Sequence, residues 1–86
     1  MTERPVTIQN RIGLHSRKAS RFIKEAIRFK SDIYVLKDGV EYNGKSIMGI
    51  LSMSAFQGDT ITIRADGPDE KEAVDHLVTH IESDVD

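Results

Sequence analysis

Residues 32–43 read DIYVLKDGVEYN, and this stretch decides the fold. Residues 32–37 carry the aliphatic and aromatic side chains that favour a strand, and Asp38-Gly39 is a pair that favours a tight hairpin turn. Residues 40–43 can then form a second strand. Because strands joined by so short a turn are antiparallel, the stretch predicts an antiparallel pair within a sheet.

The segments on either side of this hairpin predict two further strands and three helices. Residues 6–8 and 60–65 alternate between apolar and polar side chains, as strands with one buried face do. Residues 19–27 have one apolar stripe at helical spacing, residues 46–53 suit a two-turn helix, and residues 67–81 suit a longer one.

Two residue types indicate where helices begin. Ser46 is a favourable N-cap for the short helix, and Pro68 suits the first helical position of the last one. The order strand, helix, strand, strand, helix, strand, helix then predicts an α+β fold, an open-faced two-layer sandwich. Its four-stranded sheet would be largely antiparallel, and its three helices would cover one face of that sheet.

Length and composition limit the kind of protein this can be. The chain has 86 residues, of which 38% are hydrophobic and 30% charged, and it contains no Cys. This size predicts a single domain over residues 1–86, without a disulfide scaffold or a thiolate metal site. No apolar run approaches the length of about 18 residues that spans a membrane, and residues 1–4 do not resemble a signal peptide. We therefore expect a cytoplasmic protein without membrane contact.

Charge is distributed unevenly along the chain. Residues 1–45 contain 10 Lys or Arg and 5 Asp or Glu, whereas residues 46–86 contain 2 and 9. The basic residues concentrate between positions 11 and 30, which indicates attraction to an anionic partner or a phosphate group. The same residues could instead form the solvated face of a helix. Nucleic acid is not an expected partner, because few aromatic residues lie among the basic ones and the acidic half would be repelled.

The candidate chemical site is residues 13–17, which read GLHSR. His15 lies just before a predicted helix N-terminus, where unpaired N–H groups favour an anion, and Arg17 can donate two hydrogen bonds to a phosphate. Neutral imidazole is a nucleophile, so His15 could accept a phosphoryl group by in-line attack of the ring nitrogen nearer the backbone. The alternative is a residue of the helix cap with no chemical function.

A second group of candidate residues lies on the last predicted helix. His76 and His80 are four residues apart, and Glu72 is one turn earlier. This spacing can bring side chains to one metal ion, but no fourth ligand accompanies them. We therefore expect no metal site and no cofactor, and a solvated stripe is the simpler interpretation.

Three separated motifs resemble those of a known family. They are GLHSRKA at residues 13–19, KSIMG at residues 45–49 and ADGPDE at residues 65–70. Together they resemble the histidine-containing phosphocarrier proteins (HPr) of the phosphoenolpyruvate:sugar phosphotransferase system, and the resemblance extends over residues 6–81. It implies the same fold that the hydrophobic pattern predicts, and a carrier rather than an enzyme.

The resemblance also implies a role for each residue near His15. His15 would accept a phosphoryl group from enzyme I, which phosphoenolpyruvate charges, and would pass it to the IIA domains of sugar permeases. Arg17 would stabilise the phosphohistidine. The unpaired N–H groups of the helix start, rather than the resemblance, predict that Ser16 and Lys18 contact the phosphate. We expect this carrier to act as a monomer.

Ser46 resembles a regulatory site of the same family. An ATP-dependent HPr kinase/phosphorylase would phosphorylate it, and the phosphoserine form would bind a catabolite-control transcription regulator. A phosphate there would lie at a helix N-terminus and add charge with little change of fold. A helix cap alone also explains a serine at this position.

The resemblance further implies a docking surface for partners. It would combine the apolar residues Ile47, Met48 and Leu51 with the basic residues Arg21 and Lys24. The alternative is that Met48 and Leu51 belong to the core, since a short helix must bury one face. Met48 is the better docking candidate, because methionine adapts to several partners.

Lys18 departs from the family, which almost always has proline at this position. Proline would fix φ and remove an N–H donor, so lysine predicts a looser first turn with one more donor. The ammonium group opposes the helix dipole but attracts a phosphoryl group. A second hypothesis is therefore a regulatory HPr-like protein that acts through Ser46 and whose phosphoryl transfer through His15 is impaired by Lys18.

Overall fold

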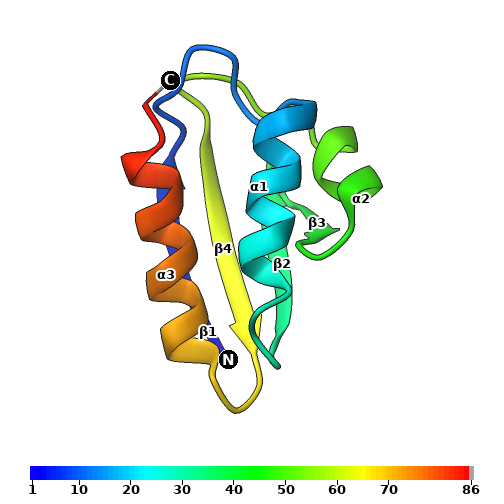
Figure 1. Cartoon of the computed structure of the whole chain (residues 1–86), viewed down its shortest axis with the longest axis vertical. Coiled ribbons are helices and arrows are strands. Elements are labelled where there is room, and N and C mark those ends of the chain that lie inside the picture. Colours follow the sequence, from blue (N-terminus) through cyan, green and yellow to red (C-terminus); the bar gives the residue numbers. More distant parts are fainter. Residues whose placement is uncertain (86) are drawn as a thin grey trace.

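The computed structural model describes residues 1–85 and contains one four-stranded sheet and three helices (Figure 1). The elements are β1 (Thr2–Thr7), α1 (Ser16–Ala26), β2 (Asp32–Lys37), β3 (Val40–Asn43), α2 (Ile47–Ser52), β4 (Thr60–Asp66) and α3 (Glu70–Ser83). The strand order is β1-β4-β2-β3, and every neighbouring pair is antiparallel. The predicted fold class and element order are confirmed.

The predicted hairpin joins β2 and β3. Asp38 and Gly39 have φ angles of 52° and 79°, the positive values that two-residue hairpin turns require. Lys37 and Val40, the residues directly before and after this turn, are partners in the antiparallel pair. The turn therefore sets the register of this edge of the sheet.

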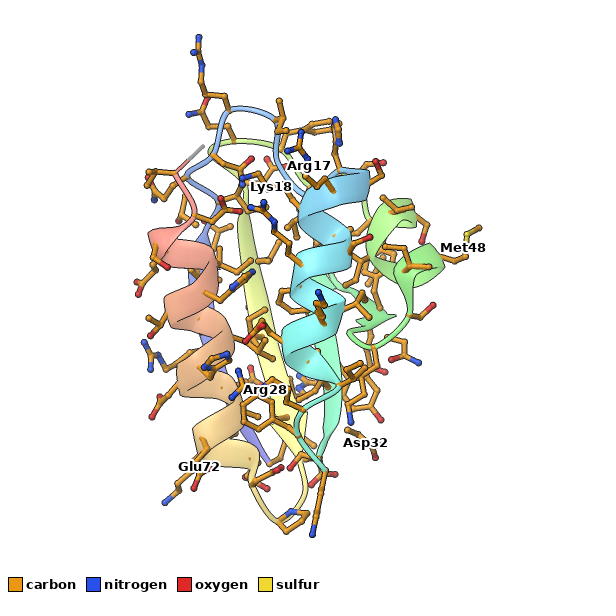
Figure 2. All side chains as sticks on the ribbon, in the orientation of Figure 1. Arg17, Lys18, Arg28, Asp32, Met48 and Glu72 are labelled. Atoms are coloured by element: carbon orange, nitrogen blue, oxygen red, sulfur yellow. The ribbon has the colours of Figure 1, made fainter. Side chains whose placement is uncertain are left out.

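The core fills the space between the helices and one face of the sheet (Figure 2). Phe22 on α1 and Leu77 on α3 are fully buried against the inward side chains of β2 and β4. Burying a side chain of this size stabilises the fold by about 1.5–3 kcal/mol. Among the described residues, no helix has the length and apolarity that crossing a bilayer requires.

Three local predictions need correction. Ile27 was predicted in the buried stripe but is 59% exposed, because it caps the end of α1 and lies toward solvent beside Ile23. The first strand begins at Thr2 rather than at residue 6, since an edge strand accommodates Pro5 and charged residues. Pro68 lies in the turn before α3, and Asp69 is the N-cap.

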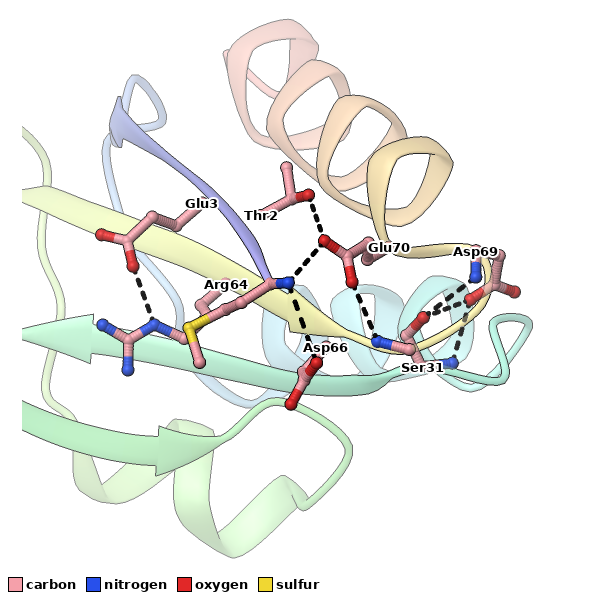
Figure 3. A network of polar contacts seen from close by, with 9 residues as sticks. Thr2, Glu3, Ser31, Arg64, Asp66, Asp69 and Glu70 are labelled. Carbon is pink, nitrogen blue, oxygen red and sulfur yellow. Dashed lines mark hydrogen bonds and ion pairs between the residues drawn. The ribbon is translucent and has the colours of Figure 1, made fainter.

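Asp69 fastens the start of α3 to the turn between α1 and β2 (Figure 3). Its carboxylate accepts hydrogen bonds from the Ser31 hydroxyl at 2.6 Å and from the Lys30 and Ser31 backbone N–H groups, both at 2.9 Å. These bonds, the Ser31 hydroxyl first, lower the pKa of Asp69 to about 2. The next residue, Glu70, accepts from the N-terminal ammonium and the Thr2 hydroxyl, which lower its pKa to about 2 as well.

An acid-sensitive contribution to stability follows from these two carboxylates. A pKa that is lower in the folded state than in the unfolded chain stabilises the fold above the unfolded pKa, here about 4–4.5, and the effect is lost as pH falls toward 2. We expect Asp69→Asn to be less stable than the parent protein at pH 6 and to approach its stability near pH 2.5. Urea unfolding at both pH values measures this gap, and a gap of constant size would contradict the assignment.

Candidate functional site

The loop from residue 9 to residue 15 positions His15 at the start of α1. Gly13 has a φ of +70°, and an added Cβ would lie 2.2 Å from the Ala55 carbonyl oxygen. Only glycine fits so close to that backbone. Next to it, the Leu14 N–H donates to the same Ala55 oxygen at 3.0 Å, and the Leu14 side chain is buried. The loop is therefore anchored directly before the histidine.

His15 is the N-cap residue of α1, with extended backbone angles of φ −101° and ψ 179°. Its carbonyl oxygen accepts the first helical hydrogen bond, from Ala19 at 2.8 Å, and its ring makes no capping hydrogen bond with the described residues. His15, Ser16 and Arg17 are all exposed. An exposed ring at a helix N-terminus can receive an anionic group, which the helix dipole would stabilise.

Lys18 differs from its neighbours, because its side chain is buried although it lies in the same turn (Figure 2). Its ammonium forms an ion pair with Asp84 at 2.6 Å, just after the end of α3. This ion pair opposes the loosening that was predicted for the turn. The spacing of residues in the sequence could not reveal it. Contact of a phosphate with the backbone at Ser16 and Lys18 stays a prediction.

An open hollow of about 410 Å³ lies on one side of His15. Its lining combines the His15 loop with the end of α2 and the segment after it: Ile12, Leu14, His15, Ser16, Leu51, Ser54, Ala55 and Phe56. Ile12 and Phe56 are 46% and 61% exposed, and sequence analysis missed both. Each lies in a loop, where no periodicity distinguishes an exposed apolar residue from a buried one.

The predicted docking residues are all exposed, and one of them, Leu51, lines this hollow. On α2, Ile50 is fully buried, whereas Ile47, Leu51 and above all Met48, which is 73% exposed, face solvent. The alternative that Met48 and Leu51 belong to the core is therefore wrong. The helix α2 lies beside the N-terminal half of α1 (Figure 1). Arg21 and Lys24 line a second hollow of about 310 Å³ along α1, together with Arg17, Ser20, Ile23 and Ile27.

Ser46 is the N-cap of α2, as predicted. Its hydroxyl oxygen accepts a hydrogen bond from the Gly49 N–H at 3.1 Å, and its backbone N–H donates to the Asn43 carbonyl at 3.2 Å. The side chain is half-buried at the rim of the exposed apolar residues. A modification at this position would add charge next to Ile47 and Met48.

The two histidines of α3 lie between α3 and α1. His76 Nε2 is 2.6 Å from the Glu25 carboxylate, and this bond, followed by one from Arg28, lowers the pKa of Glu25. His80 packs edge-on against Phe22, and burial lowers its pKa. Each ring therefore contacts α1 separately, and the described residues contain no group of three or more side chains suited to a metal.

Comparison with known proteins identifies relatives over almost the whole chain. A family model described as "PTS HPr component phosphorylation site" matches residues 2–83. The chain is 43% identical to the HPr-like protein Crh of Halalkalibacterium halodurans, over 98% of this chain and 100% of that one. It is 40% identical to the phosphocarrier protein HPr of Cupriavidus necator, over 94% and 91%. A crystal structure of HPr from Thermoanaerobacter tengcongensis has a TM-score of 0.94 and 45% identity, over 99% and 96%.

Proposed function

The chain belongs to the HPr family of phosphocarrier proteins, and on that premise we propose that it carries phosphoryl groups on His15, from enzyme I to IIA domains. The observation that carries the proposal is the exposed His15 ring at the N-terminus of α1, with Arg17 exposed in the same turn. The cytoplasm, where its partners handle incoming sugar, is the proposed location.

The proposed reaction moves one phosphoryl group from enzyme I to His15. A ring nitrogen of His15, the one nearer the backbone, attacks the phosphorus of phosphorylated enzyme I in line with the leaving atom of that protein. The new P–N bond forms as the bond between phosphorus and enzyme I breaks, and the electron pair of the broken bond stays on enzyme I. The same steps in reverse roles pass the group to a IIA domain. The protein therefore supplies position and charge and needs no cofactor of its own.

Arg17 and the first turn of α1 stabilise the charge on the phosphoryl group. The guanidinium can donate two parallel hydrogen bonds to phosphate oxygens. The backbone N–H groups of Ser16 and Lys18 belong to the N-terminal turn of α1, which is the positive end of the helix dipole. The exposed apolar residues of α2 and the basic residues Arg21 and Lys24 would hold the partner beside His15.

A second candidate function is regulation through Ser46. It is favoured by the similarity to a protein named HPr-like protein Crh, and by the position of Ser46 at the rim of the exposed apolar residues. Phosphorylation by an ATP-dependent HPr kinase/phosphorylase would place a dianion beside the docking surface. That charge would weaken docking of enzyme I and favour a catabolite-control transcription regulator.

One experiment with two arms separates the two functions. Intact mass is measured after incubation with phosphoenolpyruvate and enzyme I from the same source, and separately after incubation with ATP and the kinase. We expect one phosphoryl group in the first arm that is lost in acid, and fragment spectra that place it on His15. Light scattering on the same sample tests the expected monomer.

Two outcomes of this experiment would refute a part of the proposal. An acid-labile group on any residue other than His15 would refute the site assignment. No transfer from enzyme I, together with an acid-stable phosphoryl group on Ser46, would refute the carrier proposal in favour of the regulatory one.

A further inference from the structure

Ser54, just after the end of α2, has a backbone conformation that serine seldom adopts. Its φ is +53°, in the left-handed region, and its N–H donates to the Leu51 carbonyl at 3.4 Å. It follows the C-cap residue Met53, and glycine is the residue that most often ends a helix in this way. A residue with a Cβ is strained at such a φ. Ending the helix therefore does not explain why this residue is a serine.

The strain at Ser54 differs from that at Asp38. Among residues 1–85, these are the two residues other than glycine that have a positive φ, and the hairpin turn requires that angle of Asp38. Strained residues persist where the surrounding structure holds them, and they concentrate at functional sites. The surroundings of Ser54 therefore indicate what its side chain does.

Ser54 and His15 are each one residue away from a pair that is joined by a hydrogen bond. The Leu14 N–H, directly before His15, donates at 3.0 Å to the carbonyl of Ala55, directly after Ser54. Gly13 lies against the same carbonyl, since an added Cβ would be 2.2 Å from its oxygen. Both Ser54 and His15 line the hollow of about 410 Å³. The backbone contacts thus fix Ser54 beside the candidate phosphorylation site.

This hollow has apolar walls and a few polar groups. The polar side chains among its lining residues are His15, Ser16 and Ser54. Ser54 is exposed, and its hydroxyl has no hydrogen-bond partner within residues 1–85. Such a hydroxyl can donate to an incoming anion without giving up a bond inside the fold. Apolar neighbours reduce the water around that bond and so strengthen it.

We propose that Ser54 is a further residue of the phosphoryl-transfer site, and that its hydroxyl donates a hydrogen bond to the phosphoryl group beside His15. This inference rests on the proposed function of His15. During transfer, negative charge is spread over the three equatorial oxygens of the phosphoryl group. Arg17 can bind two of these oxygens, and Ser54 supplies a donor for the third. The proton stays on the serine oxygen, so the bonds that form and break at His15 are unchanged.

Three variants of Ser54 separate the hydroxyl from the backbone strain. Ser54→Ala removes the hydroxyl and keeps the strain, so we expect transfer from enzyme I to slow about 10-fold at an unchanged melting temperature. Ser54→Gly removes both, so transfer slows equally while the melting temperature rises by about 4 °C. Ser54→Thr keeps the hydroxyl and adds a β-branch, so transfer stays within about twofold of the parent rate while the melting temperature falls.

Asp38→Gly is the matched control for strain, because it relieves a positive φ in the hairpin turn. Its melting temperature should rise as well, and its transfer rate should not change. A purely structural role of Ser54 predicts instead that the transfer rate follows the melting temperature in every variant. A transfer rate of Ser54→Ala within twofold of the parent rate would overturn the proposal. If Ser54→Thr does not fold, Ser54→Ala and Ser54→Gly decide by the same criterion.

A measurement without enzyme I keeps this inference separate from the proposed function. Phosphoramidate transfers its phosphoryl group to a histidine nitrogen and releases ammonia, and the His15→Ala variant identifies the phosphorus NMR signal of His15. A hydrogen bond to the dianion lowers the pKa of the phosphoryl group. We therefore expect this pKa to be higher by about half a pH unit in Ser54→Ala and Ser54→Gly, and to have the parent value in Ser54→Thr.

The two measurements can fail independently. Equal pKa values of the phosphoryl group in the parent and in Ser54→Ala would overturn the contact with Ser54. If enzyme I transfers no phosphoryl group but the pKa difference is present, the proposed function fails and the contact is supported.

Discussion

Replacing Arg17 by alanine is expected to slow phosphoryl transfer to His15 by about 100-fold, while His15→Ala abolishes it. The guanidinium is exposed in the first turn of α1, where it can bind the phosphoryl oxygens as charge shifts during transfer. Water and salt screen this exposed guanidinium more than they would screen a buried one. The expected loss of rate is therefore near the lower end of the range for groups that stabilise charge during a reaction. Rapid-quench measurement of transfer from phosphorylated enzyme I gives the rate.

Two controls show whether the loss is specific. Lys71→Ala removes an exposed cation from α3, on a different element, and should leave the rate unchanged. The melting temperature of Arg17→Ala should equal that of the parent, because the Arg17 side chain is exposed to solvent. A large drop in melting temperature, or a transfer rate within twofold of the parent, would show that Arg17 is not a phosphate-binding residue.

Gly13→Ala is expected to destabilise the fold by about 2 kcal/mol or more, a loss of about 8 °C or more in melting temperature. The added methyl group would meet the Ala55 carbonyl oxygen at 2.2 Å and the Phe56 Cα at 2.8 Å. Both are backbone or backbone-attached atoms, so the loop must move away from residues 55–56 and lose the Leu14 hydrogen bond. Phosphorylation of His15 should slow as well, since the loop carries it. Thermal unfolding and the transfer assay measure the two effects.

Gly39→Ala is the matched control for this prediction. Gly39 also has a positive φ, +79°, but an added Cβ would have no neighbour within 4 Å. Its substitution should cost only the backbone strain, about 1 kcal/mol. Equal losses in the two variants would mean that strain alone accounts for Gly13 and that its close approach to Ala55 does not constrain the site.

Local pattern was sufficient to predict most of the fold. The hairpin at Asp38-Gly39 depends on turn geometry within four residues, and the helices depend on spacings of three and four residues, so neighbouring positions carry the information. The prediction failed where a distant element decided the outcome. Pro68 lies outside α3 because Asp69 binds the turn at Ser31, and β1 extends to Thr2 because β4 pairs with it.

The same distinction between local pattern and distant contacts holds for the candidate site. The sequence by itself placed His15 and Arg17 together at a helix start, because they lie within one turn and their types suit phosphate. Only the tertiary structure decided that Ala55 requires glycine at position 13, that Ile12 and Phe56 flank the hollow beside His15, and that Lys18 is buried against Asp84. Lys18 and Asp84 are 66 residues apart in the chain. Their contact depends on how α1 and α3 pack on the sheet, and no spacing in the sequence encodes that arrangement.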